Sequence, residues 1–174
     1  MKFKPKKNII IISTLILTLF TSCDDQEVTT FYLVRHAEKE MNDSTEKQNN
    51  DPKLTIEGKQ RAQKLADLLQ EEKISAIYAT VYQRNMKTVA PLARSKDLSI
   101  NNYEWYEWQP MIDSIKQEYT SKSVLICGHG DNLLPMIDYL NGKRPQEKLA
   151  KREYDKIFKI MYEPDTTIVT TLTY

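Results

Sequence analysis

The apolar and polar positions of this chain repeat in two different ways. Short, nearly continuous apolar runs are typical of strands that are buried on both faces of a sheet. Between these runs, apolar residues recur every three or four positions, which is typical of helices with one buried face. The predicted strands are residues 30–34, 74–80, 98–103 and 123–127, and the predicted helices are residues 56–72, 82–95, 110–119 and 132–140.

The C-terminal residues follow a third pattern. Residues 156–162 alternate between two sets of side chains, Pro164-Asp165 favours a turn, and residues 166–174 are rich in Thr and Val. This pattern is typical of a β-hairpin or of a pair of edge strands. Strands that alternate with helices are typical of a parallel sheet covered on both faces. We therefore expect an α/β fold, a three-layer α/β/α sandwich whose mostly parallel sheet has an antiparallel C-terminal edge.

Polar side chains follow each of the four predicted parallel strands. In sheets of this kind, ligands bind outside the carboxyl ends of the strands. The residues at those positions are two arginines, one acid and the two histidines of the sequence, namely Arg35 and His36, Arg84, Glu104, and His129. We expect these side chains to converge at one edge of the sheet.

These side chains suit the chemistry of a phosphate ester. The guanidinium fork binds phosphate oxygens in a bidentate way, so the two arginines suggest a dianionic ligand. A neutral imidazole is nucleophilic near pH 7, so one histidine can attack phosphorus and form a phosphohistidine that water then hydrolyses. The other histidine can donate a hydrogen bond to the phosphoryl oxygens in the transition state. The leaving alkoxide needs a proton, for which Glu104 is the first candidate and Glu107 the second.

The first 22 residues differ from the rest of the chain. Lysines at positions 2, 4, 6 and 7 precede an apolar run from residue 9 to residue 20, which has the length of a signal-peptide core and is too short to span a membrane. With Thr21-Ser22-Cys23 after it, the segment resembles a bacterial lipoprotein signal peptide. The resemblance implies a signal peptide over residues 1–22 and a lipid on the thiol of Cys23. A tether over residues 23–29 would then join the lipid to a single domain over residues 30–174, anchored to a membrane of the cell envelope on its extracytoplasmic side. An uncleaved anchor and a plain secretory signal are the alternatives.

The charge and cysteine content argue against several classes of protein. The 174 residues have a net charge of +1, and without residues 1–22 the chain keeps 21 basic and 24 acidic side chains. A mildly acidic domain argues against a nucleic-acid partner. If Cys23 carries a lipid, Cys127 has no disulfide partner, and one cysteine with two distant histidines is not a metal-binding pattern. We therefore expect no metal and no other cofactor.

Several motifs resemble one known family in order along the chain. Arg35-His36-Ala37-Glu38-Lys39 resembles the signature of the histidine phosphatase superfamily, also called phosphoglycerate-mutase-like, and is most similar to its small Arg-His-Ala-Glu-Lys branch. The other matching segments are Asp51 to Gly58, Tyr78 to Thr88, Gly128 to Asn132 and Glu153-Tyr154-Asp155. The resemblance thus extends over about residues 30–174.

The resemblance implies a role for each matching residue. His36 would be the phosphorylated nucleophile, Arg35, Arg84 and His129 would line the phosphate pocket, and Asn42 stands where relatives place a phosphate-contacting asparagine. Many relatives carry Ser-Asn-Thr after the second histidine, where this chain has Gly130-Asp131-Asn132. Asp131 is therefore a third candidate for the acid, beside Glu104 and Glu107.

The expected function is that of a metal-independent phosphatase. Its substrate would be a small phosphomonoester or a phosphorylated protein side chain, because the short insertions leave no cap to enclose a large substrate. The alternative from another class is a catalytically silent lipoprotein that binds phosphate or a related ligand. A phosphoglycerate-mutase-type phosphotransferase is less favoured, since it must keep its phosphoenzyme dry and no lid is evident.

Overall fold

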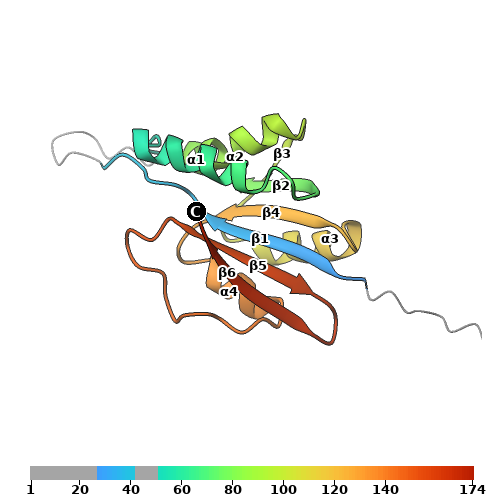
Figure 1. The fold of residues 1–174 in the computed structure, drawn as a ribbon. Coiled ribbons are helices and arrows are strands. Elements are labelled where there is room, and N and C mark those ends of the chain that lie inside the picture. The colour runs from blue at the N-terminus through green and yellow to red at the C-terminus, as the bar shows by residue number, and fades with distance from the viewer. Residues whose placement is uncertain (1–26, 42–50) are drawn as a thin grey trace, which may run out of the picture.

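A six-stranded sheet runs through the middle of the computed structural model, which describes residues 27–41 and 51–174 (Figure 1). The strands are β1 (Thr29–Arg35), β2 (Ile74–Thr80), β3 (Ile100–Tyr103), β4 (Ser123–Gly128), β5 (Lys156–Tyr162) and β6 (Thr167–Thr173). Their order in the sheet is β3-β2-β4-β1-β5-β6. The first four in this order are parallel, whereas β5 and β6 are each antiparallel to their neighbours. The predicted mostly parallel sheet with an antiparallel C-terminal edge is confirmed.

Four helices cover the two faces of the sheet (Figure 1). They are α1 (Ile56–Leu68), α2 (Gln83–Ser95), α3 (Trp108–Glu118) and α4 (Leu133–Tyr139). Alternate residues of β1 belong to two separate cores: Phe31 and Leu33 pack with α3 and α4, and Tyr32 and Val34 pack with α1 and α2. This alternation confirms the three-layer arrangement, because a strand buried on both faces sends successive side chains to opposite layers.

Three element boundaries differ from the predictions by two residues or more. The first helix ends at Leu68 rather than at residue 72. Beyond its end, the ammonium of Lys96 donates hydrogen bonds to the carbonyls of Gln70 and Glu72. The third strand begins at Ile100 rather than at residue 98, since the N–H of Leu98 still donates to Ala93 at the end of α2.

The third difference is at the start of α3. This helix begins at Trp108, two residues before the predicted start, so that Pro110 lies inside its first turn. Proline is tolerated there because the first N–H groups of a helix have no intrahelical acceptor.

A close backbone contact joins α1 to the segment after β1. A Cβ at Gly58 would lie 2.2 Å from the carbonyl oxygen of Glu38, so no other residue fits at this position without a backbone shift. Thr55 caps the helix by accepting a hydrogen bond from the Gly58 N–H at 3.0 Å. The first turn of α1 is thereby fixed against the segment 35–39, which follows β1 and contains His36.

Several predictions fall on residues that the structure does not describe. The predicted signal peptide over residues 1–22, Cys23 and Asn42 all lie outside the described residues. Within residues 27–41 and 51–174, no helix has both the length and the apolar character needed to cross a membrane. Cys127 is fully buried in the core, as its apolar surroundings in the sequence predict.

Candidate active site

The ends of β1 and β4 bring the two histidines together. These strands are parallel neighbours in which Arg35 lies opposite Gly128, and the N–H of His36 donates to the Gly128 carbonyl at 3.1 Å. The imidazole rings of His36 and His129 follow directly, with centroids 5.5 Å apart. Parallel strands that end at the same level thus turn two distant sequence positions into one site.

His36 is held in a single tautomer. Its side chain is almost fully buried, with a relative exposure of 4%, and its Nδ1 lies 2.8 Å from the carbonyl oxygen of Ala37. A carbonyl oxygen can only accept, so Nδ1 carries the proton and Nε2 keeps its lone pair. Burial lowers the pKa of His36 to about 3, and the nearby His129, Arg35 and Arg84 act in the same direction. The imidazole is therefore neutral at pH 7 and nucleophilic at Nε2.

His129 is anchored through different partners. Its backbone N–H donates to the Oδ1 of Asn132 at 2.8 Å, and its ring Nε2 lies 3.1 Å from the hydroxyl of Thr80 at the end of β2. Burial lowers the pKa of His129 to about 4, with Arg84 acting in the same direction and Asp131 opposing it. This imidazole is also neutral at pH 7, but a hydroxyl can donate or accept, so its tautomer is not fixed by that contact.

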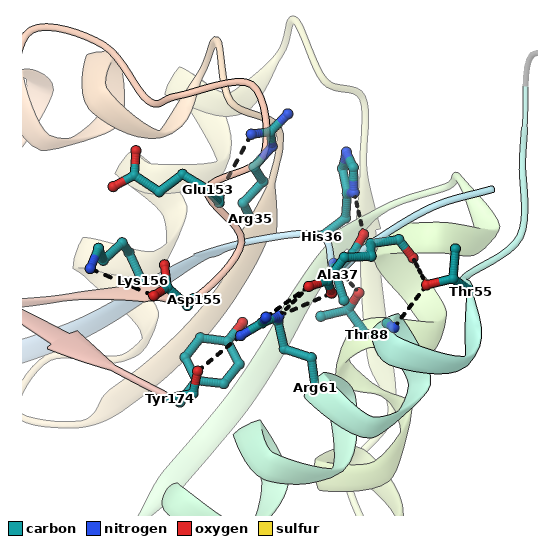
Figure 2. A network of polar contacts seen from close by, with 12 residues as sticks. Arg35, His36, Ala37, Thr55, Arg61, Thr88, Glu153, Asp155, Lys156 and Tyr174 are labelled. Carbon is teal, nitrogen blue, oxygen red and sulfur yellow. Dashed lines mark hydrogen bonds and ion pairs between the residues drawn. The ribbon is translucent and has the colours of Figure 1, made fainter. Parts of the chain in front are cut away.

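Arg35 lies beside His36 and is held by the loop before β5 (Figure 2). Its Nη1 donates to the carbonyls of Ala150 and Glu153 at 3.0 and 3.4 Å, and its guanidinium lies over the Tyr154 ring, 4.6 Å from the centroid. Gly130 permits this position, because a Cβ there would be 3.3 Å from the guanidinium carbon. The Nε of Arg35 is buried and finds no hydrogen-bond partner among the described residues, so it can donate to an anion placed beside it.

Arg84 reaches the site from the first turn of α2. Its guanidinium lies over the Tyr82 ring at 4.2 Å, and its Nη1 is 3.6 Å from the carboxylate of Asp51. The same carboxylate accepts hydrogen bonds from the Gln83 N–H at 2.9 and 3.1 Å. Asp51 thus caps α2 from a separate loop, which satisfies an N–H group that would otherwise lack an acceptor.

Two buried polar residues of α2 tie this helix to both histidine-bearing strand ends. The hydroxyl of Thr88 accepts from the Ala37 N–H at 2.9 Å and donates to the Arg84 carbonyl at 2.7 Å. The Nδ2 of Asn85 donates to the Gly128 carbonyl at 2.9 Å. Both side chains are fully buried, so a lost partner would leave an unsatisfied polar group in the core. The helix that carries Arg84 is therefore fixed relative to His36 and to His129.

The acid of the Arg-His-Ala-Glu-Lys motif points away from the histidines. Glu38 forms an ion pair with Arg61 of α1 at 2.7 Å. Arg61 in turn donates to the backbone carbonyl of Tyr174 at 2.9 Å (Figure 2). Lys39 has its pKa lowered by burial and by the positive charges of Arg84 and Arg35. The site is therefore a cluster of positive charge around two neutral imidazoles, which favours a bound oxyanion.

The structure separates the three candidate acids. A cavity of about 200 Å³ is lined by Tyr82, Arg84, Trp105, His129 and Asp131. Glu104 and Glu107 line a different cavity, with Val81, Asn102, Tyr103, Pro110, Met111 and Ser114. Of the predicted residues, the structure thus brings Arg35, His36, Arg84 and His129 together and adds Asp131, whereas it directs Glu104 and Glu107 to the neighbouring cavity.

Several residues of the site were not expected from the sequence. Tyr154 packs against the His36 ring at 5.8 Å between centroids, and Tyr82 packs against the His129 ring at 5.5 Å. Tyr154 belongs to the segment Glu153-Tyr154-Asp155, which resembles the family but to which no role was assigned. An aromatic residue between two charged ones in such a segment is the signal that could have identified it. Asn85 and Thr88 could have been found because they are polar residues at inward-facing positions of a predicted helix.

No group of three His, Cys, Asp or Glu side chains within the described part of the chain is arranged to hold a metal ion. The chemistry available to these residues is that of anion binding by arginine, nucleophilic attack by a neutral imidazole, and hydrogen-bond donation.

Comparison with known proteins identifies relatives of this arrangement. Residues 31–109 match the sequence model of the histidine phosphatase superfamily (branch 1), a segment that includes Arg35, His36 and Arg84. No curated protein sequence matches the chain.

Solved structures share the fold at low sequence identity. A protein described as the phosphohistidine phosphatase SixA from Agrobacterium tumefaciens is 18% identical, with a TM-score of 0.65 over 83% of this chain and 98% of that one. A protein histidine phosphatase SixA complexed with tungstate is 15% identical, with a TM-score of 0.61 over 83% of this chain and 96% of that one. A phosphoglycerate mutase from Bacillus anthracis str. Sterne is 15% identical, with a TM-score of 0.66 over 85% of this chain and 94% of that one. The described sheet and helices therefore have the phosphoglycerate-mutase-like fold.

Proposed function

We propose that this chain belongs to the histidine phosphatase superfamily, whose model matches residues 31–109, and that it is a metal-independent phosphatase that hydrolyses phosphomonoesters through a covalent phosphohistidine on His36. The observation that carries the proposal is the single tautomer of His36. Its Nδ1–H donates a hydrogen bond to the Ala37 carbonyl at 2.8 Å, and burial lowers its pKa to about 3, so Nε2 is an unprotonated nucleophile at neutral pH.

The positive groups around His36 supply the phosphate pocket in this proposal. Arg84 and the unpartnered Nε of Arg35 would bind the phosphoryl oxygens, and a ring N–H of His129 would donate to an oxygen as charge shifts during transfer. A neighbour of the same fold is described as complexed with tungstate, a tetrahedral oxyanion, which is in keeping with oxyanion binding by this fold.

The reaction would proceed in two displacements. His36 Nε2 attacks phosphorus and forms the N–P bond while the bond from phosphorus to the leaving oxygen breaks. That oxygen takes a proton and departs as the alcohol. A water molecule then attacks the phosphohistidine, the N–P bond breaks, and inorganic phosphate leaves with the imidazole neutral again.

Asp131 is the acid that the cavities favour for the leaving group. It shares a cavity with Arg84 and His129, whereas Glu104 and Glu107 do not. Asp131 would donate its proton to the leaving oxygen and recover one from the attacking water.

The experiment that tests the proposal compares the full-length wild-type protein with the His36→Ala variant in the presence of a metal chelator. We expect the wild-type protein to release phosphate from 4-nitrophenyl phosphate and to carry an acid-labile phosphate on His36, detected by mass spectrometry after rapid quenching. The variant should show neither. Binding of inorganic phosphate without turnover or phosphoenzyme would overturn the proposal and favour a ligand-binding protein on this fold.

We also propose that the domain is held at a membrane by a lipid on Cys23. The sequence pattern of residues 1–23 supports this proposal. The wild-type protein should fractionate with membranes and show the added mass of lipid, whereas Cys23→Ala should lose both. A wild-type protein recovered without lipid would contradict it.

A further inference from the structure

Exposed apolar side chains gather next to the candidate active site. Val81, Trp105 and Tyr106 have relative exposures of 54%, 44% and 59%. Trp105 lines the cavity of Arg84 and His129 and contacts the Tyr106 ring, whereas Val81 lines the neighbouring cavity of Glu104 and Glu107. Val81 follows β2 and the other two follow β3, and these strands are parallel neighbours, so both loops leave the same edge of the sheet. Exposed apolar side chains beside a cavity are typical of a surface that binds a ligand or a partner protein.

Two aromatic rings border the cavity that contains Arg84 and His129. Tyr82 forms one wall, where its ring lies under the Arg84 guanidinium and meets the His129 ring edge-on. Trp105 lines the same cavity of about 200 Å³. A phosphoryl group bound by Arg84 and His129 would therefore have its ester oxygen close to two aromatic surfaces.

The position of Trp105 is linked to that of His129. The Nδ2 of Asn132 donates to the backbone carbonyl of Trp105 at 3.4 Å, and the Oδ1 of the same side chain accepts from the His129 N–H at 2.8 Å. The Asn132 side chain is itself buried, with a relative exposure of 4%. The tryptophan therefore has a defined place relative to the phosphate pocket, as a specificity-determining residue requires.

We propose that Trp105 and Tyr82 select phosphomonoesters whose leaving group carries an aromatic ring. This inference rests on the proposed phosphatase function and names its substrate class. A ring in this cavity would contact both side chains in offset or edge-to-face geometry. Small aromatic phosphates and the phosphotyrosine side chain of a protein share this chemistry.

The test compares benzyl phosphate with butyl phosphate on the full-length protein. The two alcohols are of similar acidity, so the esters differ in the ring and not in the ease with which the leaving group departs. We expect wild-type kcat/KM to favour benzyl phosphate by about tenfold, the size of an aromatic contact. Trp105→Ala should bring this ratio to about one. Trp105→Phe should retain most of the preference.

Tyr106→Ala is the matched control. Tyr106 is the adjacent exposed aromatic residue and contacts Trp105 edge-on at 5.7 Å, but it does not line the cavity. Its removal should leave the ratio unchanged. A wild-type ratio near one, or an unchanged ratio in Trp105→Ala, would overturn the aromatic selection.

The outcome separates this inference from the function on which it rests. If both esters phosphorylate His36 without preference, the phosphatase stands and the aromatic selection fails. If neither ester yields phosphate or phosphoenzyme, the phosphatase itself fails. Comparing free phosphotyrosine with a phosphotyrosine peptide then distinguishes the two sources of the ring: a higher kcat/KM for the peptide identifies a protein substrate, and the reverse identifies a small molecule.

Discussion

The ends of β1 and β4 hold their histidines in unlike ways. At the end of β1, the Ala37 carbonyl accepts a hydrogen bond from the Nδ1–H of His36 and so fixes the direction of the Nε2 lone pair. At the end of β4, a threonine hydroxyl faces Nε2 of His129 and allows either tautomer. A nucleophile needs a lone pair of fixed direction, whereas a group that remains with the phosphoryl oxygens through two displacements benefits from freedom to donate. The same strand-end position can therefore serve different roles, because the partner of the ring and not the strand decides what the imidazole does.

The largest expected effect on activity comes from removing each of the two imidazoles in turn. His36→Ala should lower kcat for 4-nitrophenyl phosphate by at least about 10⁴-fold and abolish the phosphoenzyme, since no nucleophile remains. His129→Ala should lower kcat by about 10²- to 10³-fold, the size of one lost transition-state donor, and should still form the phosphoenzyme. Steady-state assays measure kcat, and a rapid quench at alkaline pH followed by mass spectrometry measures the phosphoenzyme. A phosphoenzyme in the first variant, or its complete absence in the second, would reverse the assigned roles.

The next test asks whether the loop after β4 also supplies the proton for the leaving group. Asp131→Asn should lower kcat/KM for butyl phosphate by about 10²-fold, because an alkoxide is a poor leaving group without an acid. The effect on 4-nitrophenyl phosphate should be below about threefold, since nitrophenolate departs without a proton. Glu104→Gln is the control and should change neither substrate. If instead Glu104→Gln carries the loss, the acid comes from the loop after β3.

A smaller loss of activity should follow when the hydrogen bond that fixes one of the two strand ends is removed. Thr88→Val removes the acceptor of the Ala37 N–H beside His36, and Asn85→Ala removes the donor to Gly128 beside His129. Each change should lower activity about tenfold and the free energy of unfolding by about 1–3 kcal/mol.

Thr88→Val and Asn85→Ala should differ in whether kcat or the binding of inorganic phosphate changes. Thr88→Val should act mainly on kcat because it disturbs the nucleophile, and Asn85→Ala should mainly raise the inhibition constant of inorganic phosphate because it disturbs the pocket. Thr88→Ser should restore kcat. Loss of stability with unchanged kinetic constants in both variants would show that these residues have a structural role alone.

The smallest effect concerns pH. Folding lowers the pKa of His36 to about 3, below the value of about 6.5 in an unfolded chain. Between these values the unfolded state binds the additional proton, so the stability contributed by neutral His36 is complete above pH 6.5 and is lost as the pH falls toward 3. The free energy of unfolding should therefore decrease by about 1.4 kcal/mol per pH unit on account of this residue.

Urea unfolding at pH 7, 6 and 5 measures this slope, and His36→Asn should make it shallower by that amount. The ring proton resonances of both histidines should also stay constant between pH 8 and pH 5, since the pKa of His129 is lowered to about 4. A midpoint near 6.5 for either ring would contradict the neutral site.

Periodicity predicted the sheet well for a physical reason. Each central strand is buried on both faces, so its apolar run is continuous and its end is marked by the first polar residue, as at Arg35 and His36. The ends of helices depend on distant partners instead. The carbonyls of Gln70 and Glu72 bind Lys96, and no pattern within residues 56–72 reports that contact.

The expectation that polar residues after the carboxyl ends of parallel strands converge predicted the grouping of Arg35, His36, Arg84 and His129. It succeeded because it depends only on sheet topology. It could not separate Glu104 from Asp131, since the cavity that an acid faces depends on the turn that follows the strand. The Glu107 N–H donates to the Glu104 carbonyl at 2.8 Å, and this turn places Trp105 rather than either glutamate in the cavity with His129. Asp51 and Tyr154 arrive from loops, whose course periodicity does not constrain.

The place of β1 in the sheet also affects how the chain reaches its folded state. β1 pairs only with β4 and β5, which follow it by about ninety and one hundred and twenty residues. During synthesis from the N-terminus, the apolar run Phe31–Val34 therefore has no strand partner until most of the chain has been made. Pairings of this sequence separation are slow to form and leave such a strand exposed to association with other chains. The strand that carries the nucleophile is thus among the first to be made and among the last to be protected, so early association with other chains would be expected to begin at this strand.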